Sequence, residues 1–147
     1  MRLVTSMLTI TELSNIQIKS AVSIIRRKFD AESKIYRYGT YPGERDFYNV
    51  DVDLFDVDFS DDLYGNIRKL ISAYEEILRT FKVYMDIIAS NDDTEGEIQI
   101  YSKDKNDVGN FGLFVTKRQI PNVQPYYSSD VCNAYVNLTH VSFGVYL

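Results

Sequence analysis

Four aspartates alternate with apolar residues in segment 50–58, and they are the residues of this chain best placed to do chemistry. Asp51 and Asp53 come first and are followed by Asp56 and Asp58. On an extended strand, two carboxylates separated by one residue point to the same face, about 7 Å apart along the chain. Such a pair can hold Mg²⁺ for phosphoryl or nucleotidyl transfer. The same alternation is typical of a half-buried antiparallel strand with its acidic face in water, and we favour this second interpretation.

A glycine and a threonine precede the aspartates and give the segment a longer pattern. Gly39-Thr40 is followed, after a gap, by Asp51-x-Asp53 flanked by apolar residues. This arrangement resembles the active-site segment of the nucleotidyltransferase superfamily. The resemblance implies that Asp51 and Asp53 bind the metal and that Gly39 and Thr40 hold the nucleotide phosphates.

Three features of the chain depart from that family's pattern. Thr40 stands where serine is usual, and Pro42-Gly43 follows where the family begins a helix. Only Glu97 could supply the third carboxylate. A nucleotidyltransferase-like enzyme that uses Mg²⁺ is therefore an alternative hypothesis, not the leading one.

The single histidine and the single cysteine offer little catalytic chemistry. His140 lies among Leu138, Val141 and Phe143, a setting typical of a packed side chain. Cys132 has no partner for an intrachain disulfide, which favours a reducing compartment. The sequence also has no glycine-rich phosphate-binding motif. We therefore expect a protein that is not an enzyme and that uses no metal and no other cofactor.

Charge is unevenly distributed along a chain of net charge −5. Residues 41–65 hold eight acidic residues against Arg45, a sum of −7, whereas residues 1–40 hold seven basic and three acidic residues, a sum of +4. Binding to nucleic acid needs clustered Lys and Arg, so we expect no direct nucleic-acid partner. The acidic segment also suits a third hypothesis, an acidic inhibitor or immunity protein that blocks a nuclease.

Length and hydropathy predict one domain, 1–147, without contact to a membrane. The 147 residues match the size of one ordinary domain. No apolar run approaches the ~18 residues of a membrane span. The first ten residues do not read as a signal peptide. These features predict a cytoplasmic protein, or one incorporated in a virion.

Apolar periodicity predicts two helices, at about 10–29 and 61–89. The first follows a Thr9–Glu12 capping box, and the second would span ~43 Å, which is long for a small domain. Five strands are predicted, with a turn at 39–44 and a loop at 119–130; the strands lie at 35–38, 47–59, 97–102, 111–117 and 134–146. The predicted fold is α+β in the order α-β-β-α-β-β-β, with both helices packed on a mostly antiparallel sheet.

The C-terminal part is rich in tyrosine and poor in charge. Residues 108–147 contain only Lys117, Arg118 and Asp130 as charged residues. An apolar strand without charges is a poor free edge, so we expect a homo-oligomer or a multi-protein assembly to cover it. The predicted interface residues are Tyr126, Tyr127, Tyr135, Val141, Phe143, Val145, Tyr146 and Leu147.

The predicted element order, the small size and the acidic, tyrosine-rich composition resemble small tail-assembly proteins of tailed bacteriophages, of the terminator or completion type. The resemblance implies a ring at the tail or the head–tail junction. Our leading hypothesis is therefore a non-enzymatic structural protein that acts through protein–protein contacts.

Overall fold

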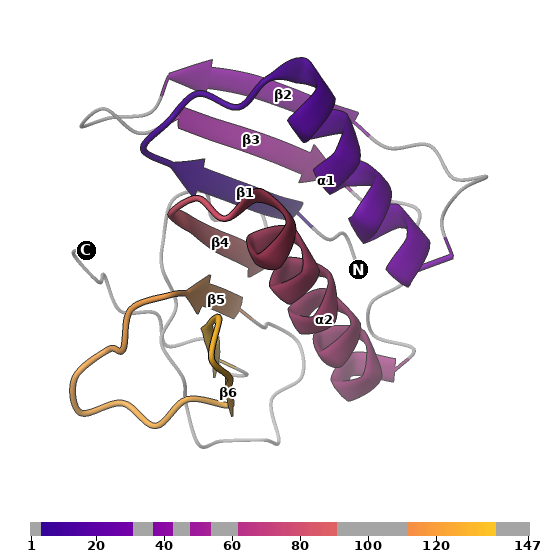
Figure 1. The fold of residues 1–147 in the computed structure, drawn as a ribbon. Coiled ribbons are helices and arrows are strands. Elements are labelled where there is room, and N and C mark those ends of the chain that lie inside the picture. The colour runs from indigo at the N-terminus through magenta and orange to yellow at the C-terminus, as the bar shows by residue number, and fades with distance from the viewer. Residues whose placement is uncertain (1–3, 31–36, 43–47, 54–61, 91–111, 138–147) are drawn as a thin grey trace.

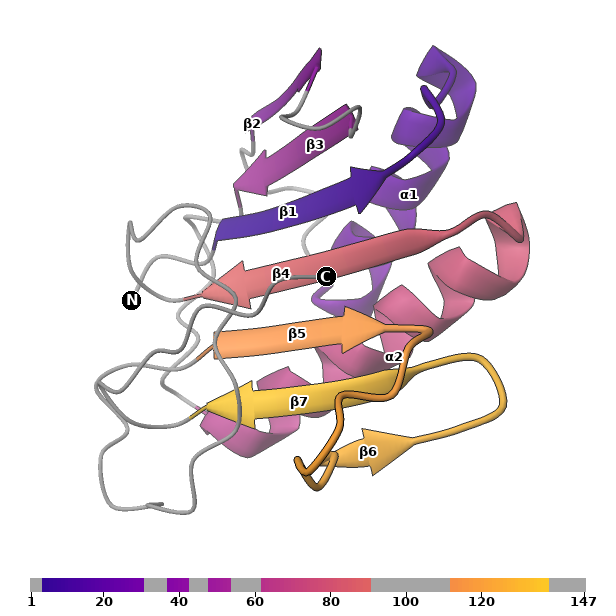
Figure 2. The same cartoon turned by 90° about the vertical axis from the view of Figure 1, so that its left-hand side faces the viewer.

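Among the residues that the computed structural model describes, seven antiparallel strands form one sheet, and two helices cover one face of it (Figures 1 and 2). This confirms the predicted α+β class. The structure describes residues 4–30, 37–42, 48–53, 62–90 and 112–137. Its elements are β1 (Val4–Thr9), α1 (Asn15–Lys28), β2 (Arg37–Pro42), β3 (Tyr48–Asp53), α2 (Leu63–Phe81), β4 (Met85–Ser90), β5 (Gly112–Thr116), β6 (Tyr127–Ser128) and β7 (Asn133–Asn137).

The sheet order is β2-β3-β1-β4-β5-β7-β6, so the first strand of the chain lies near the middle. The sequence pattern did not predict β1, because threonine and serine interrupt its apolar residues. Thr5 and Thr9 are nevertheless fully buried. The Thr5 hydroxyl donates to the Val52 carbonyl and the Thr9 hydroxyl to the Tyr84 carbonyl, each at 3.1 Å. These hydrogen bonds satisfy the two hydroxyls inside the core.

The core lies between the sheet and the two helices. Each helix turns one apolar stripe toward the sheet, as residues spaced by three and four predict. Ile25 of α1 and Ile67, Leu70 and Ile77 of α2 are fully buried in the same cluster as Met7 of β1. This layer fixes how the two helices sit over the strands.

The first helix begins later than its sequence pattern predicts. Its capping box is formed by Ser14 and Gln17 instead of Thr9 and Glu12. The Gln17 amide donates to the Ser14 hydroxyl at 3.2 Å, and the Ser14 amide donates to the Gln17 side-chain oxygen at 2.9 Å. The prediction of a helix from residue 10 is therefore wrong by five residues, because the better cap lies at Ser14.

The second helix ends at Phe81, so the prediction of a helix to residue 89 is wrong. Lys82 adopts the left-handed conformation with φ 54°, and its amide donates to the Leu78 carbonyl. The chain then enters strand β4. Met85 and Ile88 continue the helical spacing by chance, because β4 is a central strand with apolar residues on both of its faces, Met85 toward the helices and Ile88 on the opposite face.

Strand β2 runs through Gly39 and Thr40 to Pro42, so the prediction of a turn from residue 39 is wrong over 39–42. Strand β6 lies within the predicted loop at 119–130. The predicted strand at 111–117 is confirmed as β5. The strand predicted at 97–102 and the ends of the strands predicted at 47–59 and 134–146 lie outside the described residues.

Candidate partner-binding surfaces

The aspartate pair lies on β3, between β2 and β1. Val50 and Val52 are buried toward the helices, so Asp51 points to the opposite face and is half-buried. The Ser6 hydroxyl donates to Asp51 at 2.7 Å. The strand register places Gly39 directly opposite Asp51. The structure therefore brings together two positions that the sequence pattern singled out.

The surroundings of Asp51 differ from those that the nucleotidyltransferase resemblance implies. Gly39 and Thr40 lie within a strand and pair with β3, whereas a phosphate-binding segment needs backbone amides that are free to face the ligand. Within the described ranges, no three His, Cys, Asp or Glu side chains come together as metal ligands. Glu97 and His140 lie outside these ranges. The described part of this face is a strand surface of mixed polarity.

The predicted interface tyrosines fall into two groups. Tyr126 and Tyr127, at β6, are each 38% exposed. Tyr135 is fully buried on the sheet face away from the helices, and its hydroxyl accepts a hydrogen bond of 2.8 Å from the Ile120 amide. Tyr135 must therefore be removed from the predicted interface, because it packs within its own chain. The other predicted interface residues, 141–147, lie outside the described residues.

Strand β7, the described part of the last predicted strand, has a neighbouring strand on both sides for part of its length. Residues Asn133–Asn137 pair with β5 along their whole length, and Asn133 and Ala134 also pair with β6. Cys132, just before this strand, is buried, and burial raises the pKa of its thiol. A raised pKa keeps the thiol protonated and weakly nucleophilic at neutral pH.

A buried carboxyl group that the sequence pattern did not single out lies at the start of β4. Asp86 is 1% exposed and accepts a hydrogen bond of 2.8 Å from the Tyr84 hydroxyl. The Arg118 guanidinium covers the Tyr84 ring at 4.8 Å from its centroid. Burial raises the pKa of Asp86, although the hydroxyls of Thr116 and Tyr84 act against this. The sequence does signal this group, as an aspartate inside an apolar run, but the predicted helix at 61–89 included that run.

A groove of about 540 Å³ opens where α2 ends, and we call it the α2 groove. The left-handed turn at Lys82 and the residue that follows β5, Lys117, bring two exposed ammonium groups to it. Three cations and one carboxylate line the groove, which gives a net charge of +2. Its lining residues are Leu78, Arg79, Lys82, Lys117, Asp130 and Val131.

One of these cations already has a partner in the molecule. Arg79 donates to both carboxylate oxygens of Asp130, at 2.9 and 3.4 Å, and it holds the pKa of Asp130 below its ordinary value. Glu75 lies 3.9 Å from Arg79 and accepts a hydrogen bond of 2.7 Å from the Tyr127 hydroxyl. Within the described part of the chain, Lys82 and Lys117 lie within 4 Å of no carboxylate. Among the described side chains, Lys82 and Lys117 are therefore the cations of the groove that no carboxylate pairs.

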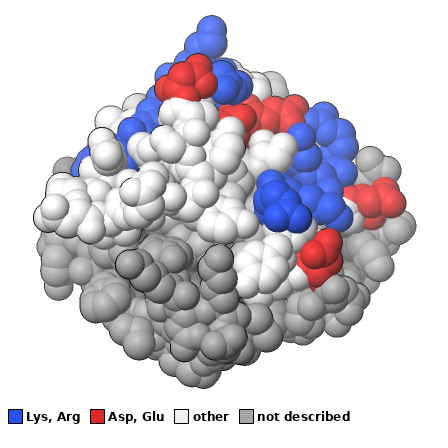
Figure 3. Space-filling model, turned by 90° about the horizontal axis from the view of Figure 1, so that it is seen from below, with Lys and Arg blue, Asp and Glu red and all other residues white. Residues whose placement is uncertain are grey.

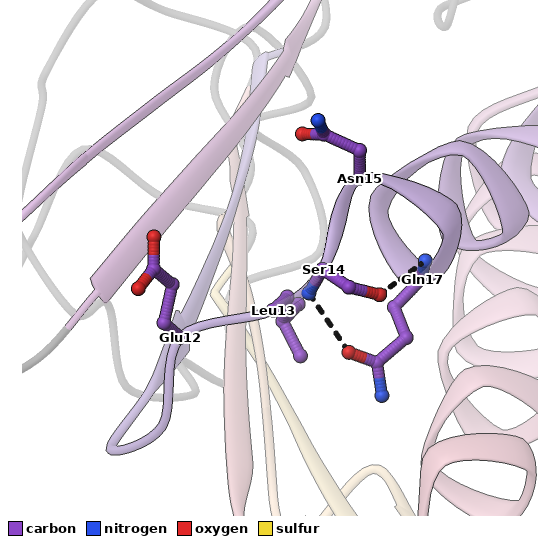
Figure 4. A pocket seen from close by; sticks show the side chains of 5 residues that line it. All are labelled: Glu12, Leu13, Ser14, Asn15 and Gln17. Atoms are coloured by element: carbon purple, nitrogen blue, oxygen red, sulfur yellow. Dashed lines mark hydrogen bonds between the residues drawn. The ribbon is translucent and has the colours of Figure 1, made fainter.

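A second groove, of about 390 Å³, lies at the start of α1, and we call it the α1 groove. Figure 4 shows the Ser14–Gln17 hydrogen bonds beside it, with Glu12 on the segment that leads in from β1. The residues at this end include the two most exposed large apolar side chains of the described chain. Ile16 is 80% exposed and Ile10 is 55% exposed. An apolar contact with polar groups around it is the usual composition of a protein interface.

The described surface mixes charges of both signs. On the face in Figure 3, Lys and Arg side chains gather with Asp and Glu side chains among them. Such a surface suits a protein partner better than a phosphate backbone, which needs a continuous basic stripe. No helix among the described residues has the length and apolar character to cross a membrane.

Comparisons with known proteins return no relative. No family model matches the chain, and neither a curated protein nor a solved structure matches it. The function is therefore inferred from the two grooves and the side chains around them.

Proposed function

We propose that this protein is a non-enzymatic assembly protein that acts through protein–protein contacts, including contacts between its own copies. The observation that carries the proposal is the exposure of two isoleucines, Ile10 and Ile16, in the same stretch of the chain as the residues that line the α1 groove. Fully burying an isoleucine stabilises a contact by about 1.5–3 kcal/mol. Two such side chains at one end of the molecule can anchor an interface, with the polar residues of the groove as its rim.

Two further features support this proposal. Tyr126 and Tyr127 are exposed at β6, and tyrosine is enriched in protein interfaces. The phage tail-assembly resemblance implies a larger particle as the place of action, at a tail or head–tail junction. The structure adds strands β1 and β4 to the predicted element order on which that resemblance rests. The proposal therefore depends on the exposed isoleucines and tyrosines.

The oligomeric state in solution tests the proposal. We expect light scattering of the wild-type chain to give a mass above that of one chain, rising with concentration. Ile16→Asp should raise the dissociation constant by at least about tenfold, which corresponds to about 1.4 kcal/mol of lost contact energy. Ser23→Asp is the matched control, because Ser23 is exposed on the same helix and is not apolar.

Two outcomes would count against the proposal. A wild-type chain that stays monomeric at the highest accessible concentration, and that shows no change on Ile16→Asp, contradicts self-assembly. A thermal shift with Mg²⁺ and a nucleotide that Asp51→Asn removes would instead support the enzyme alternative.

A further inference from the structure

The α2 groove is lined by both positive charge and apolar side chains, so a binding partner must match both. Lys82 and Lys117 supply the available positive charge, whereas Leu78 and Val131 supply an apolar lining. A segment that alternates carboxylates with apolar side chains would satisfy both parts of the groove. Successive carboxylates at every second residue lie about 7 Å apart on an extended segment, so one such segment can reach two separate ammonium groups.

The chain itself contains a segment of this kind. Residues 51–62 read Asp-Val-Asp-Leu-Phe-Asp-Val-Asp-Phe-Ser-Asp-Asp, with six aspartates and no Lys or Arg. Its charge is opposite to that of the α2 groove, and its valine, leucine and phenylalanine residues match the apolar lining.

The groove lies at the opposite end of the molecule from Asp53 and Asp62, the two described residues that bound the middle of the acidic segment. Asp53 pairs with Val4 at the sheet end where β4 finishes, whereas Lys82 and Lys117 lie where β4 begins and β5 finishes. Asp62 caps the start of α2, and Lys82 follows its end. The helix between them is about 28 Å long, at ~1.5 Å for each residue. This separation favours a contact between two copies over a contact within one copy.

We infer that the acidic segment 51–62 of one copy docks in the α2 groove of a second copy, head to tail. The contact is heterologous, because the two surfaces differ, and each copy keeps one free groove and one free acidic segment for further copies. The result is a ring when the rotation closes and a filament when it does not. This inference rests on the proposed function, since it names the partner and the charged residues of the self-contact.

Two neutralised variants and their mixture test this contact. In the groove variant, Lys82→Ala and Lys117→Ala remove the two available cations. In the acidic variant, Asp56→Asn and Asp58→Asn remove two of the carboxylates. We expect each variant alone to give a lower mass by light scattering than the wild type at the same concentration, since only the contact through Ile10 and Ile16 remains. An equimolar mixture should give a higher mass than either variant alone, because it contains one intact groove and one intact acidic segment per pair.

The control variant carries Lys19→Ala and Arg68→Ala, which remove the same number of exposed positive charges from the two helices outside the groove. It should assemble like the wild type. Circular dichroism should show that all variants are folded. Raised salt should dissociate the wild-type assembly, since exposed charge pairs are screened.

The outcomes separate this inference from the proposed function. Assembly of the groove variant to the same mass as the wild type at the same concentration overturns the inference, and loss of that assembly on Ile16→Asp would leave the proposed function standing. A wild-type chain that is monomeric throughout overturns both. Binding of a single-stranded oligonucleotide that the groove variant loses, without a change in assembly, overturns the inference in favour of a phosphate ligand.

Discussion

Asp86 holds its carboxyl group in surroundings that disfavour its charge. The side chain is 1% exposed, and Tyr84 hydrogen-bonds only one of its oxygens. In the described part of the chain, the other oxygen has no hydrogen bond of good geometry, although the Thr116 hydroxyl is a neighbour that favours the charged form. A buried polar atom without a partner costs about 1–3 kcal/mol. The raised pKa of Asp86 expresses the same cost, because the folded state favours the protonated form.

Asp86→Asn should therefore raise the free energy of unfolding at neutral pH, by about 1 kcal/mol. A raised pKa in the folded state means that the cost of ionised Asp86 is present above that pKa and disappears as the pH falls. The difference between variant and wild type should vanish below the ordinary aspartate pKa of about 3.9. Urea unfolding at several pH values measures this. A difference that is constant with pH would show that Asp86 is not the titrating group.

Tyr74 presents a second buried polar atom, on the side of α2 that faces the core. Its side chain is fully buried, and burial raises the pKa of its hydroxyl. That hydroxyl has no hydrogen bond of good geometry in the described chain, since the neighbouring Thr5 hydroxyl donates to Val52. Tyr74→Phe should leave the free energy of unfolding unchanged or raise it by up to about 1 kcal/mol. Thermal unfolding checks this, and a loss of stability would reveal a hydrogen bond to Tyr74.

Residue type alone could predict some of these sites. The alternation of Asp51 and Asp53 with valines predicted an acidic face opposite a buried one, and the structure places Val50, Asp51 and Val52 in this way. Tyr135 was assigned to the surface because tyrosine is common in interfaces. Its burial depends on Ile120 folding back over the strand, a contact between residues distant in sequence that composition does not encode.

At the scale of elements, the start of α2 combines a cap and a glycine. The Gly65 amide donates to the Asp62 carboxylate at 3.1 Å. A Cβ at Gly65 would lie 2.1 Å from a carboxylate oxygen of Asp62, so an alanine there must displace the cap. The helix therefore retains a residue of low helix propensity in its first turn.

A double-mutant cycle tests this coupling. Asp62→Ala should lower the free energy of unfolding by about 1 kcal/mol through loss of the cap. Gly65→Ala should change the free energy of unfolding of the wild type little, because the improved helix propensity is offset by the displaced cap. In the Asp62→Ala background the same change should raise the free energy of unfolding by about 1 kcal/mol. An equal effect of Gly65→Ala in both backgrounds, by urea unfolding, would contradict the coupling.

The elements differ in how well local pattern predicts them. The apolar stripe of α2 is long and regular, so both its existence and the face it buries could be predicted. Its end could not, because Lys82 is not a residue type that usually adopts φ 54°. The apolar residues of β4 then continued the pattern into the wrong element. Strand β1 was missed because its buried threonines depend on carbonyls of β3 and of the segment before β4.

At the scale of the whole molecule, charge distribution along the sequence predicted only part of the surface. The acidic segment was evident from composition. The opposite charge had been expected in residues 1–40, whereas the α2 groove gathers its cations from the ends of α2 and β5. Its location depends on the strand order, which places β5 and β7 beside each other under the end of α2. Long-range pairing of this kind is not contained in any local pattern.

The central position of β1 has a consequence for synthesis on the ribosome. Val4–Thr9 is synthesised before both of its neighbours, because β3 and β4 begin only at Tyr48 and Met85. At about 5–20 residues per second, β4 follows several seconds later. Until β3 is made, β1 lacks both of its pairing partners and Thr5 lacks its acceptor, the Val52 carbonyl. Until the chain reaches Tyr84 and β4, Thr9 still lacks its acceptor and one edge of β1 stays unpaired. Strand β1 therefore completes its place in the middle of the sheet only after β4 has been translated.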